Sequence, residues 1–372
     1  MRKDIMAFEI VGKYNTAKVF APWIEDTASA QIKILCDQEA FKDAKIRIMP
    51  DCHAGAGCVI GFTGSFGNKI IPNIVGVDLG CGMHTSKFKA DDIDFEKLDK
   101  FILENIPFGF NGRKTIHALV EKDSWFIERV QNVCDIINES DINKQLLKCS
   151  SLGSGNHYFE LDTDGTYIYL VIHSGSRNFG HRVATYFQKK AIETCEADVP
   201  KDLKYLTGDL AQQYLYCTEV ATEYAQKSRE AMAHDIIDHM GWDIIDTFTT
   251  IHNYIDNGMI RKGAISAKKG ERVLIPLNMR DGAIIGIGKG NEDYNCSAAH
   301  GAGRIMSRSQ AKRELSMDAF IESMKGIYTS RVMESTLDEA PATYKDAQMI
   351  IDALGDTIEI EALIKPIYNF KA

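Results

Sequence analysis

A short turn in the first quarter of the chain carries two groups that could bind a metal ion. Residues 72–83 read PNIVGVDLGCGM, which places Asp78 and Cys81 three positions apart among glycines. Glycines let the backbone bend sharply, so the carboxylate and the thiol can point into one cavity. Oxygen and sulfur donors together suit a transition-metal ion such as zinc or manganese better than magnesium alone. A cysteine in such a turn is more often a small buried apolar side chain, so the metal interpretation needs further donors.

Three histidines occur in sequence settings that suit metal ligands. His157 follows a glycine-rich turn, His173 ends a β-branched and aromatic stretch, and His252 precedes an asparagine. Neutral imidazole is a common ligand of zinc and similar ions. Together with Asp78 and Cys81 these histidines make five donors, enough for two ions that share a bridging thiolate. Two ions about 3.5–4 Å apart would suit phosphoryl chemistry.

The other histidines before position 300 divide into two groups. Those in plain helical sequence are predicted to be structural: His117, His234 and His239. Those for which a structural and a functional role both stay open are His53, His84 and His181. Of these, His53 could support a metal ligand from outside the ligand shell.

His300 differs from the other histidines because only small residues flank it, in the sequence SAAHGAGR. A phosphate or a nucleotide could approach this side chain closely, and such a histidine can be a covalent nucleophile toward a phosphoryl group. We expect a helix to begin at His300. Arg304 and Arg308, four residues apart, would face the same way on this helix and hold phosphate oxygens.

The elements that must position these groups follow from apolar patterns. The apolar run Ile74, Val75 and Val77 predicts a buried strand before Asp78. Residues 166–172 (TYIYLVI) are the clearest strand and lead directly to His173. Further strands are expected around residues 8–10 and 19–20, and at 45–49, 272–275, 283–287 and 357–364.

Helices are expected where apolar residues repeat at helical spacing or a capping residue begins a polar segment. Asp94 is the expected cap of a helix that runs through Leu103. The segment 209–256 is predicted to form one or two long helices, with His252 near the end. Its aromatic and small residues repeat at helical spacing and are predicted to form a buried stripe. Two more helices are expected at 26–36 and 126–137.

The composition is that of a globular protein with ample apolar material for a core. The 372 residues include 45% hydrophobic and 26% charged residues. No run of about 18 apolar residues occurs, so we expect no membrane-spanning helix. Asp4 and Glu9 interrupt the region where a secretory signal needs apolar residues. Nine cysteines without paired spacing then indicate reduced thiols and a cytoplasmic location.

The net charge of −9 argues against a protein that coats nucleic acid non-specifically. It leaves room for a nucleic-acid enzyme with a local basic cleft. No repeat or linker divides the chain, so we predict one integrated domain, residues 1–372.

The chain resembles the RtcB family of GTP-dependent RNA ligases. The motifs that carry the resemblance run through nearly the whole chain in the family's order: MPDCHAG, GVDLGCG, GSGNHYFE, HSGSRNFGH, HN at 252–253, RKGA at 261–264, SAAHGAGR, DEAPATYK at 338–345 and a C-terminal lysine. The resemblance implies an α+β fold, a single domain with a central β-sandwich surrounded by helices. It also implies that RNA with broken ends, such as tRNA or another structured RNA, is the partner.

The resemblance further assigns roles to individual residues. The implied ligands of two Mn²⁺ ions are Asp78, Cys81, His157, His173 and His252. His300 matches the histidine that carries GMP. The positions that match groups around the guanine nucleotide are Asn156, Glu160, Asn253, Tyr344 and Lys371, and those that match phosphate-facing positions are Arg177, Arg304 and Arg308.

The implied activity is the joining of an RNA 3′-phosphate or 2′,3′-cyclic phosphate to a 5′-hydroxyl, as in RNA repair or tRNA splicing. Two alternatives stay open: a two-metal phosphodiesterase or phosphatase, and a non-catalytic RNA-end-binding relative. The sequence departs from the family pattern at Asn178, where glycine is common, and at 276–280 (PLNMR), which replaces Pro-Gly-x-Met-Gly. Because that segment is expected near the nucleotide, its change bears on guanine preference.

Overall fold

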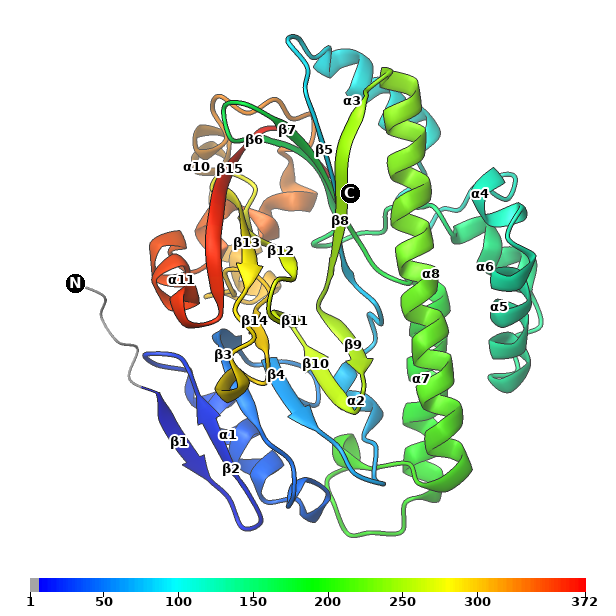
Figure 1. The fold of residues 1–372 in the computed structure, drawn as a ribbon, viewed down its shortest axis with the longest axis vertical. Coiled ribbons are helices and arrows are strands. Elements are labelled where there is room, and N and C mark those ends of the chain that lie inside the picture. The colour runs from blue at the N-terminus through cyan, green and yellow to red at the C-terminus, as the bar shows by residue number, and fades with distance from the viewer. Residues whose placement is uncertain (1–6) are drawn as a thin grey trace.

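The computed structural model describes residues 7–372, and Asp4 lies outside them. Helices and strands are mixed along the chain, which confirms the α+β class (Figure 1). The strands lie at the centre, and long helices stand to one side of them. Within residues 7–372, no helix is both long and apolar enough to cross a lipid bilayer.

A seven-stranded antiparallel sheet forms the centre of the molecule. Its spatial order is β12 (Arg272–Asn278), β13 (Gly282–Gly288), β15 (Ile358–Lys371), β6 (Tyr158–Thr163), β7 (Ile168–Ser174), β5 (Gly82–Phe88) and β8 (Ile244–Ile251). The backbone N–H of Leu274 on β12 donates to Oγ1 of Thr250 on β8 at 3.0 Å. The two edge strands therefore meet, and the sheet is curled. The start of β5 lies between the ends of β7 and β8.

Two smaller sheets pack beside this one. The larger has the order β1 (Phe8–Val11), β2 (Thr16–Val19), β3 (Arg47–His53), β4 (Ile60–Ser65), β10 (Met259–Lys262) and β9 (Asn253–Asp256). Its only parallel pair in the described chain is β2 with β3. The smaller sheet pairs β11 (Ala264–Ser266) with β14 (Ser297–Ala299), so that the segment before His300 is held in extended form.

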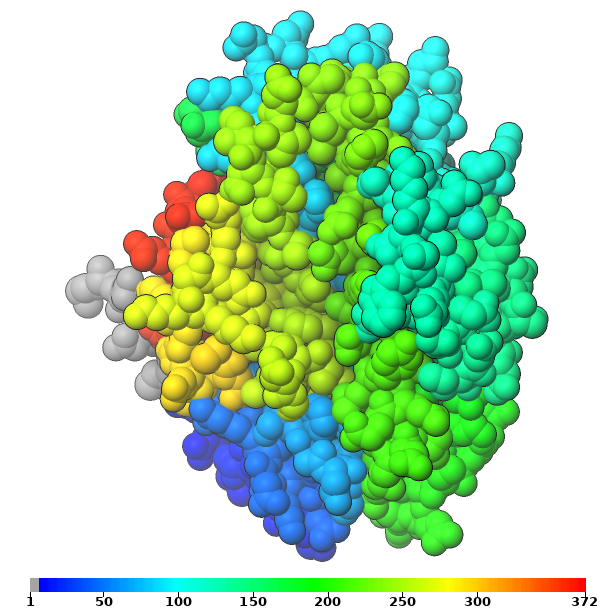
Figure 2. All heavy atoms as spheres, turned by 45° about the vertical axis from the view of Figure 1, so that its right-hand side comes forward, coloured from blue at the N-terminus to red at the C-terminus, as the bar shows by residue number. Residues whose placement is uncertain are grey.

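Helix α8 (Gly208–Met240) is the longest of the described helices and packs against β5 and β7. The predicted stripe is confirmed, because Tyr214, Cys217, Ala221, Tyr224 and Ala225 are all fully buried. Helix α7 (Arg177–Thr194) lies beside α8. Figure 2 shows the segment that holds α4 (Ala118–Glu121), α5 (Ser124–Ile136) and α6 (Ile142–Lys148) on the outside of the molecule, next to these two helices.

The remaining helices are short. They are α1 (Asp26–Cys36), α2 (Pro72–Val75), α3 (Phe95–Asn105), α9 (Arg308–Glu314), α10 (Met317–Ser323) and α11 (Ala347–Ala353). The predicted cap of α3 is confirmed, since Asp94 accepts the backbone N–H of Lys97 at 2.9 Å. A 3₁₀ segment, η4 (Glu334–Glu339), lies near α9.

Three local predictions were wrong. The expected strand before Asp78 is the helical turn α2, because Pro72 suits the first position of a helix; Val77 is exposed. The expected helix through 256 ends at Gly241, whose left-handed conformation (φ 71°) stops α8, and His252 lies between β8 and β9. No helix begins at His300.

The helix after His300 begins only at Arg308, because the glycines at 301 and 303 favour an irregular bend, the latter with φ 73°. Arg304 precedes α9 and forms an isolated bridge with Tyr344. The two arginines therefore do not share a helix face, although both still reach the same cavity.

Gly82 tests how closely β5 and β8 must approach. A Cβ atom on Gly82 would lie 2.3 Å from the carbonyl oxygen of Thr250, so Gly82→Ala should push the strands apart. We expect the free energy of unfolding to fall by about 1–3 kcal/mol, as overpacking does. Urea unfolding of both variants measures this. Gly67→Ala is the matched control, because a Cβ there meets no atom within 4 Å, and equal stability of the two variants would contradict the prediction.

Candidate active site

The turn between α2 and β5 carries Asp78 and Cys81, and a buried arginine holds it in place. Arg229 on α8 is fully buried. Its Nη1 group donates to the carbonyl oxygen of Gly80 at 2.9 Å and to that of Ser174 at 2.6 Å. One guanidinium therefore ties the turn to the end of β7, where His173 is located.

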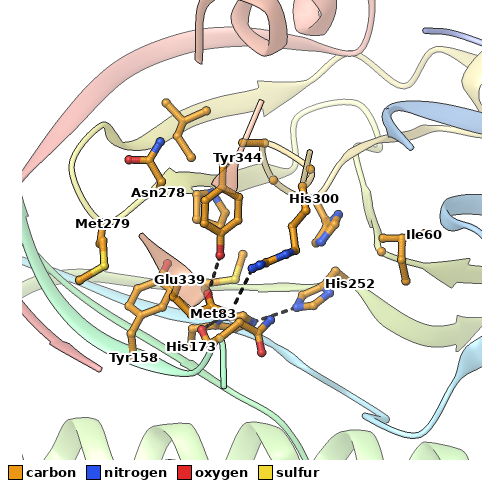
Figure 3. A pocket seen from close by; sticks show the side chains of 18 of the residues that line it. Ile60, Met83, Tyr158, His173, His252, Asn278, Met279, His300, Glu339 and Tyr344 are labelled. Atoms are coloured by element: carbon orange, nitrogen blue, oxygen red, sulfur yellow. Dashed lines mark hydrogen bonds and ion pairs between the residues drawn. The ribbon is translucent and has the colours of Figure 1, made fainter. Parts of the chain in front are cut away.

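The predicted metal ligands converge on the sulfur of Cys81. Sγ lies 3.4 Å from Nε2 of His157 and 3.3 Å from Nε2 of His173. Nε2 of His173 is also 3.1 Å from Nε2 of His252, a contact drawn in Figure 3. On the other side, Oδ2 of Asp78 lies 3.3 Å from Nε2 of His157. Two groups of three donor atoms, each within 4.8 Å of one another, therefore share Cys81.

These side chains have the chemistry of metal ligands. Nδ1 of His173 donates to the carbonyl oxygen of Asn156 at 3.0 Å, which leaves the Nε2 lone pair directed at Cys81. Burial and the neighbouring imidazoles lower the pKa of His173 and of His252 well below the usual value, so both rings are neutral near pH 7. Neutral imidazoles this close to a thiol and a carboxylate fit one or two transition-metal ions.

His300 is held by a buried carboxylate that the sequence analysis did not single out. Oδ2 of Asp51 on β3 accepts Nδ1–H of His300 at 2.6 Å and the backbone N–H of His300 at 3.1 Å. Asp51 is fully buried. This arrangement fixes the tautomer, so that the free lone pair is on Nε2. The ring also stacks on that of His252, with centroids 4.9 Å apart, which places His300 beside the donor cluster.

A cavity of about 270 Å³ opens beside His300 (Figure 3). Most residues that the resemblance assigned to the nucleotide and its phosphates line this cavity: Asn156, Glu160, Asn253, Arg304, Arg308, Tyr344 and Lys371. His173 and His252 of the donor cluster line it as well. The cavity therefore joins the histidine, the cations and the possible metal site in one space.

The departure at 276–280 lies mostly in this cavity wall. Pro276, Leu277, Asn278 and Met279 line the cavity, and Leu277 is almost fully buried. Arg280 points elsewhere, since its Nε donates to Oδ1 of the adjacent Asp281 at 2.9 Å.

Glu339 connects four cavity residues and was also missed by the sequence analysis. Its Oε2 accepts the Tyr344 hydroxyl at 2.5 Å and lies 3.1 Å from Nζ of Lys371. Its Oε1 lies 3.3 Å from Nη1 of Arg304 and 3.0 Å from Nη2 of Arg308. Burial alone would raise the pKa of the Glu339 carboxyl, but the surrounding cations and the hydroxyl outweigh it and lower the pKa to about 2. A permanent carboxylate therefore holds these cations at the cavity wall.

The pKa of the Glu160 carboxyl is shifted in the opposite direction to that of Glu339. This cavity residue is buried, and burial raises the pKa of its carboxyl to about 7. Nδ2 of Asn369 donates to Oε2 of Glu160 at 2.6 Å and fixes its orientation. The side chain is therefore held in place as a hydrogen-bonding group for a ligand in the cavity.

Arg177 lies outside the cavity wall. Its Nη2 donates to the carbonyl oxygen of Gly109 at 2.5 Å and its Nε to Oγ of Ser151 at 3.2 Å. It therefore borders the far side of the turn that carries His157, where a Cβ atom on Gly153 would lie 2.2 Å from Nη1 of Arg177.

The histidines predicted to be structural make structural contacts. Both ring nitrogens of His117 are engaged, Nε2 with Asp235 at 2.9 Å and Nδ1 with the backbone N–H of Leu119 at 3.1 Å. His234 lies close to this pair, but Asp235 is already bound by Arg113.

The remaining histidines differ in their surroundings. The His239 ring stacks on Phe101. Of the three open cases, His53 lines the cavity, His84 is buried on β5 against Ser86, and His181 is exposed on α7.

The fold and the donor cluster define a class of α+β protein that has a buried group of possible metal donors beside a cation-lined cavity. Comparison with known proteins identifies the family. The family profile described as "tRNA-splicing ligase RtcB" matches residues 38–372, and the chain belongs to the RtcB family.

Relatives of the chain include bacterial and archaeal proteins. The RNA-splicing ligase RtcB of Escherichia coli (strain K12) is 30% identical in an alignment 359 positions long that covers 85% of this chain and 87% of that protein. The tRNA-splicing ligase RtcB of Nanoarchaeum equitans (strain Kin4-M) is 28% identical in an alignment 396 positions long that covers 82% of this chain and 83% of that protein. The similarity therefore extends over most of both chains.

The Glu339 carboxylate should stabilise the fold in a pH-dependent way. Its folded pKa of about 2 lies below the ordinary 4.5, so its contribution is complete above pH 4.5 and is lost as the pH falls toward 2. Glu339→Gln should lower the free energy of unfolding by about 3 kcal/mol at pH 7, the cost of breaking a buried ion pair. The difference from wild type should shrink below pH 4.5 in denaturant titrations.

The exposed Glu314 at the end of α9 is the matched control. Glu314→Gln should change the stability by less than about 0.5 kcal/mol at any pH, as surface substitutions do. A Glu339→Gln effect that is as small, or that stays constant down to pH 2, would contradict the prediction.

Proposed function

We propose that this chain is an RNA ligase that joins an RNA 3′-phosphate or 2′,3′-cyclic phosphate to a 5′-hydroxyl, with GTP and Mn²⁺. The observation that carries the proposal is the setting of His300. Its free Nε2 belongs to a ring that stacks on His252 of the donor cluster and lines a cavity with Arg304, Arg308 and Lys371. Membership of the RtcB family and the names of the relatives support the same activity.

In the first step, Nε2 of His300 attacks the α-phosphorus of GTP. The N–P bond forms as the bond to pyrophosphate breaks, and the histidine then carries GMP. The imidazole becomes positively charged, and the Asp51 carboxylate 2.6 Å from Nδ1 stabilises that charge and keeps the ring oriented.

The cations of the cavity wall bind and orient the phosphates. The Arg304 and Arg308 guanidinium groups suit phosphate oxygens, and Lys371 adds a point charge. Glu339 keeps these cations in place before the substrate arrives, so less ordering remains to be done on binding. Glu160, Asn156, Asn253 and Tyr344 are left to contact the base and the ribose.

In the second step, an oxygen of the RNA 3′-phosphate attacks the phosphorus of the His300-bound GMP, and the N–P bond breaks. In the third step, the 5′-hydroxyl attacks the RNA 3′-phosphorus, GMP leaves, and the hydroxyl proton is lost. A cyclic phosphate must first be opened by water to a 3′-phosphate. Activation is needed because a phosphate monoester has no good leaving group.

The donor cluster is the proposed binding place for two Mn²⁺ ions. Asp78, Cys81 and His157 would hold one ion, and Cys81, His173 and His252 the other. Bound Mn²⁺ would neutralise charge on the phosphates and promote ionisation of the attacking hydroxyl. Mn²⁺ should therefore support activity where Mg²⁺ alone does not, because magnesium disfavours sulfur donors.

Labelling by GTP tests the proposal directly. Wild-type protein with Mn²⁺ and α-labelled GTP should retain the label on a denaturing gel, whereas His300→Ala should not. The His300→Ala variant should still bind Mn²⁺ and still join RNA with a pre-made 3′-diphosphoguanosine end, because the last step needs no histidine nucleophile. Cys81→Ala should lose metal content, labelling and joining together, as expected for groups that act as one unit.

The two variants serve as controls for each other. Failure of the wild type to take up label with Mn²⁺ present would contradict the ligase proposal and favour a two-metal phosphodiesterase. Normal sealing of the pre-activated end by Cys81→Ala would show that the thiolate is not a ligand.

The changed cavity wall should affect nucleotide choice. Leu277 stands where the family pattern has glycine, and it lines the cavity. We expect guanine selectivity to be relaxed, and labelling with equal GTP and ATP should show a preference below about 10⁴-fold, the discrimination that well-matched hydrogen bonds can supply. Leu277→Gly should raise the preference, with Arg280→Gly as the control outside the wall; a wild-type preference above that limit would contradict the prediction.

A further inference from the structure

Phe110 is an aromatic side chain that the fold leaves open to solvent. It is 93% exposed, the largest exposed fraction among the large hydrophobic residues in the described part of the chain. It lies in the connection between α3 and α4. Burying such a ring against a partner is favourable, because an aromatic face supplies a large apolar contact area.

The loop that carries Phe110 is held by backbone hydrogen bonds before and after the ring, the one after it from the N–H of Arg113 to the carbonyl oxygen of Leu147 at 2.7 Å. The backbone N–H of Gly109 donates to the carbonyl oxygen of Gly153 at 2.6 Å, and that of Leu152 donates to the carbonyl oxygen of Pro107 at 2.8 Å. Phe108, two residues earlier, packs edge-on against Phe370 with ring centroids 5.7 Å apart. The exposure of Phe110 is therefore set by an anchored loop.

That anchor is the same turn that carries His157. A Cβ atom on Gly153 would lie 2.1 Å from Nδ1 of His157, and one on Gly155 would lie 2.9 Å from Nη1 of Arg308. One side of the turn thus meets the Phe110 loop and the other side meets the cavity wall. The turn of residues 152–157 therefore connects the Phe110 loop with the proposed site of RNA joining.

Cations without carboxylate partners lie on or next to the loop that carries Phe110, since Nη2 of Arg177 donates to the carbonyl oxygen of Gly109. No ion pair is found for Lys114, Lys144, Lys148 or Arg177 with any carboxylate of residues 7–372. Lys148 Cγ lies 3.2 Å from where a Cβ atom on Gly112 would stand, so α6 adjoins the Phe110 loop. Burial and the like charges of Lys144 and Arg177 lower the pKa of Lys148. We call Phe110, Lys114, Lys144, Lys148 and Arg177 the Phe110 surface.

We propose that the Phe110 surface binds a single-stranded end of the RNA, with one nucleobase stacked on the Phe110 ring and the backbone phosphates on its cations. This inference rests on the proposed function and names where that substrate extends beyond the cavity. An aromatic platform with unpaired cations alongside is the usual combination for single-stranded nucleic acid, because every base has a face that stacks. The overall charge of −9 restricts such binding to a local patch of this kind.

Stacking can be measured without catalysis. Two ten-nucleotide RNAs, one with a 5′-hydroxyl end and one with a 3′-phosphate end, each carry 2-aminopurine within three nucleotides of that end. Stacking on Phe110 should change the 2-aminopurine fluorescence for one of the two, which identifies the strand. Phe110→Ala should lower the affinity for that strand about 5- to 150-fold, the equivalent of about 1–3 kcal/mol per stacked base.

The ring itself is tested by graded substitutions. Phe110→Trp should retain the affinity and the fluorescence change, whereas Phe110→Leu, which is apolar without a π face, should behave like Phe110→Ala. Trp125→Ala on α5 is the matched control, since Trp125 is 65% exposed and is not part of the Phe110 surface. Lys144→Gln and Lys148→Gln should each reduce the salt dependence of binding by about 0.7 in slope, the value for single strands. Thermal unfolding of each variant checks the fold.

The outcomes separate this inference from the proposed function. Wild-type affinity for both RNAs in Phe110→Ala and Phe110→Leu, with His300 labelled by GTP and RNA joined, would overturn the inference alone. Absence of both GTP labelling and RNA binding in the wild type would overturn the proposed function and, with it, this inference. Binding of anionic vesicles, but of neither RNA, by the Phe110 surface would assign it to a membrane instead and overturn the inference.

Discussion

The convergence of imidazole donors on the Cys81 sulfur is the contact on which the rest of the site depends. Burying three imidazoles, a thiol and part of a carboxylate in one place is costly unless they bind something in common. The curled sheet brings β5, β7 and β8 together there, and Arg229 ties the Cys81 turn to the end of β7. Their arrangement is therefore the one that a shared cation would require.

A second constraint of opposite charge shapes the other side of the cavity. Glu339 holds two arginines, a lysine and a tyrosine at the wall, while Asp51 holds His300 by two hydrogen bonds. Both carboxylates are buried, so bulk water cannot take over the hydrogen bonds and ion pairs that they make. His300 and the cations are thus positioned before any ligand arrives, which reduces the reorganisation that binding requires.

The strands and helices with a clear period were predictable, and those whose boundaries depend on glycine or proline were not. The strand before His173, the helix after Asp94 and the buried stripe of α8 follow from local pattern alone. The Pro72 turn was mispredicted because a short apolar run fits a helix or a strand equally well. Tertiary contacts then select one of the two. The strands after Gly241 and the bend after His300 were mispredicted because glycines in left-handed conformation end or prevent a helix there.

By itself the sequence determined the family and predicted the five donor residues that the structure brings together, because side-chain chemistry in glycine-rich turns is local and the motifs keep their order. Only the tertiary structure could join Asp51 to His300 or Glu339 to Arg304, since these partners lie far apart in the chain and carry no mutual spacing. The exposure of Phe110 is likewise a property of the fold, because the burial of a phenylalanine in a loop depends on which neighbours the fold places around it.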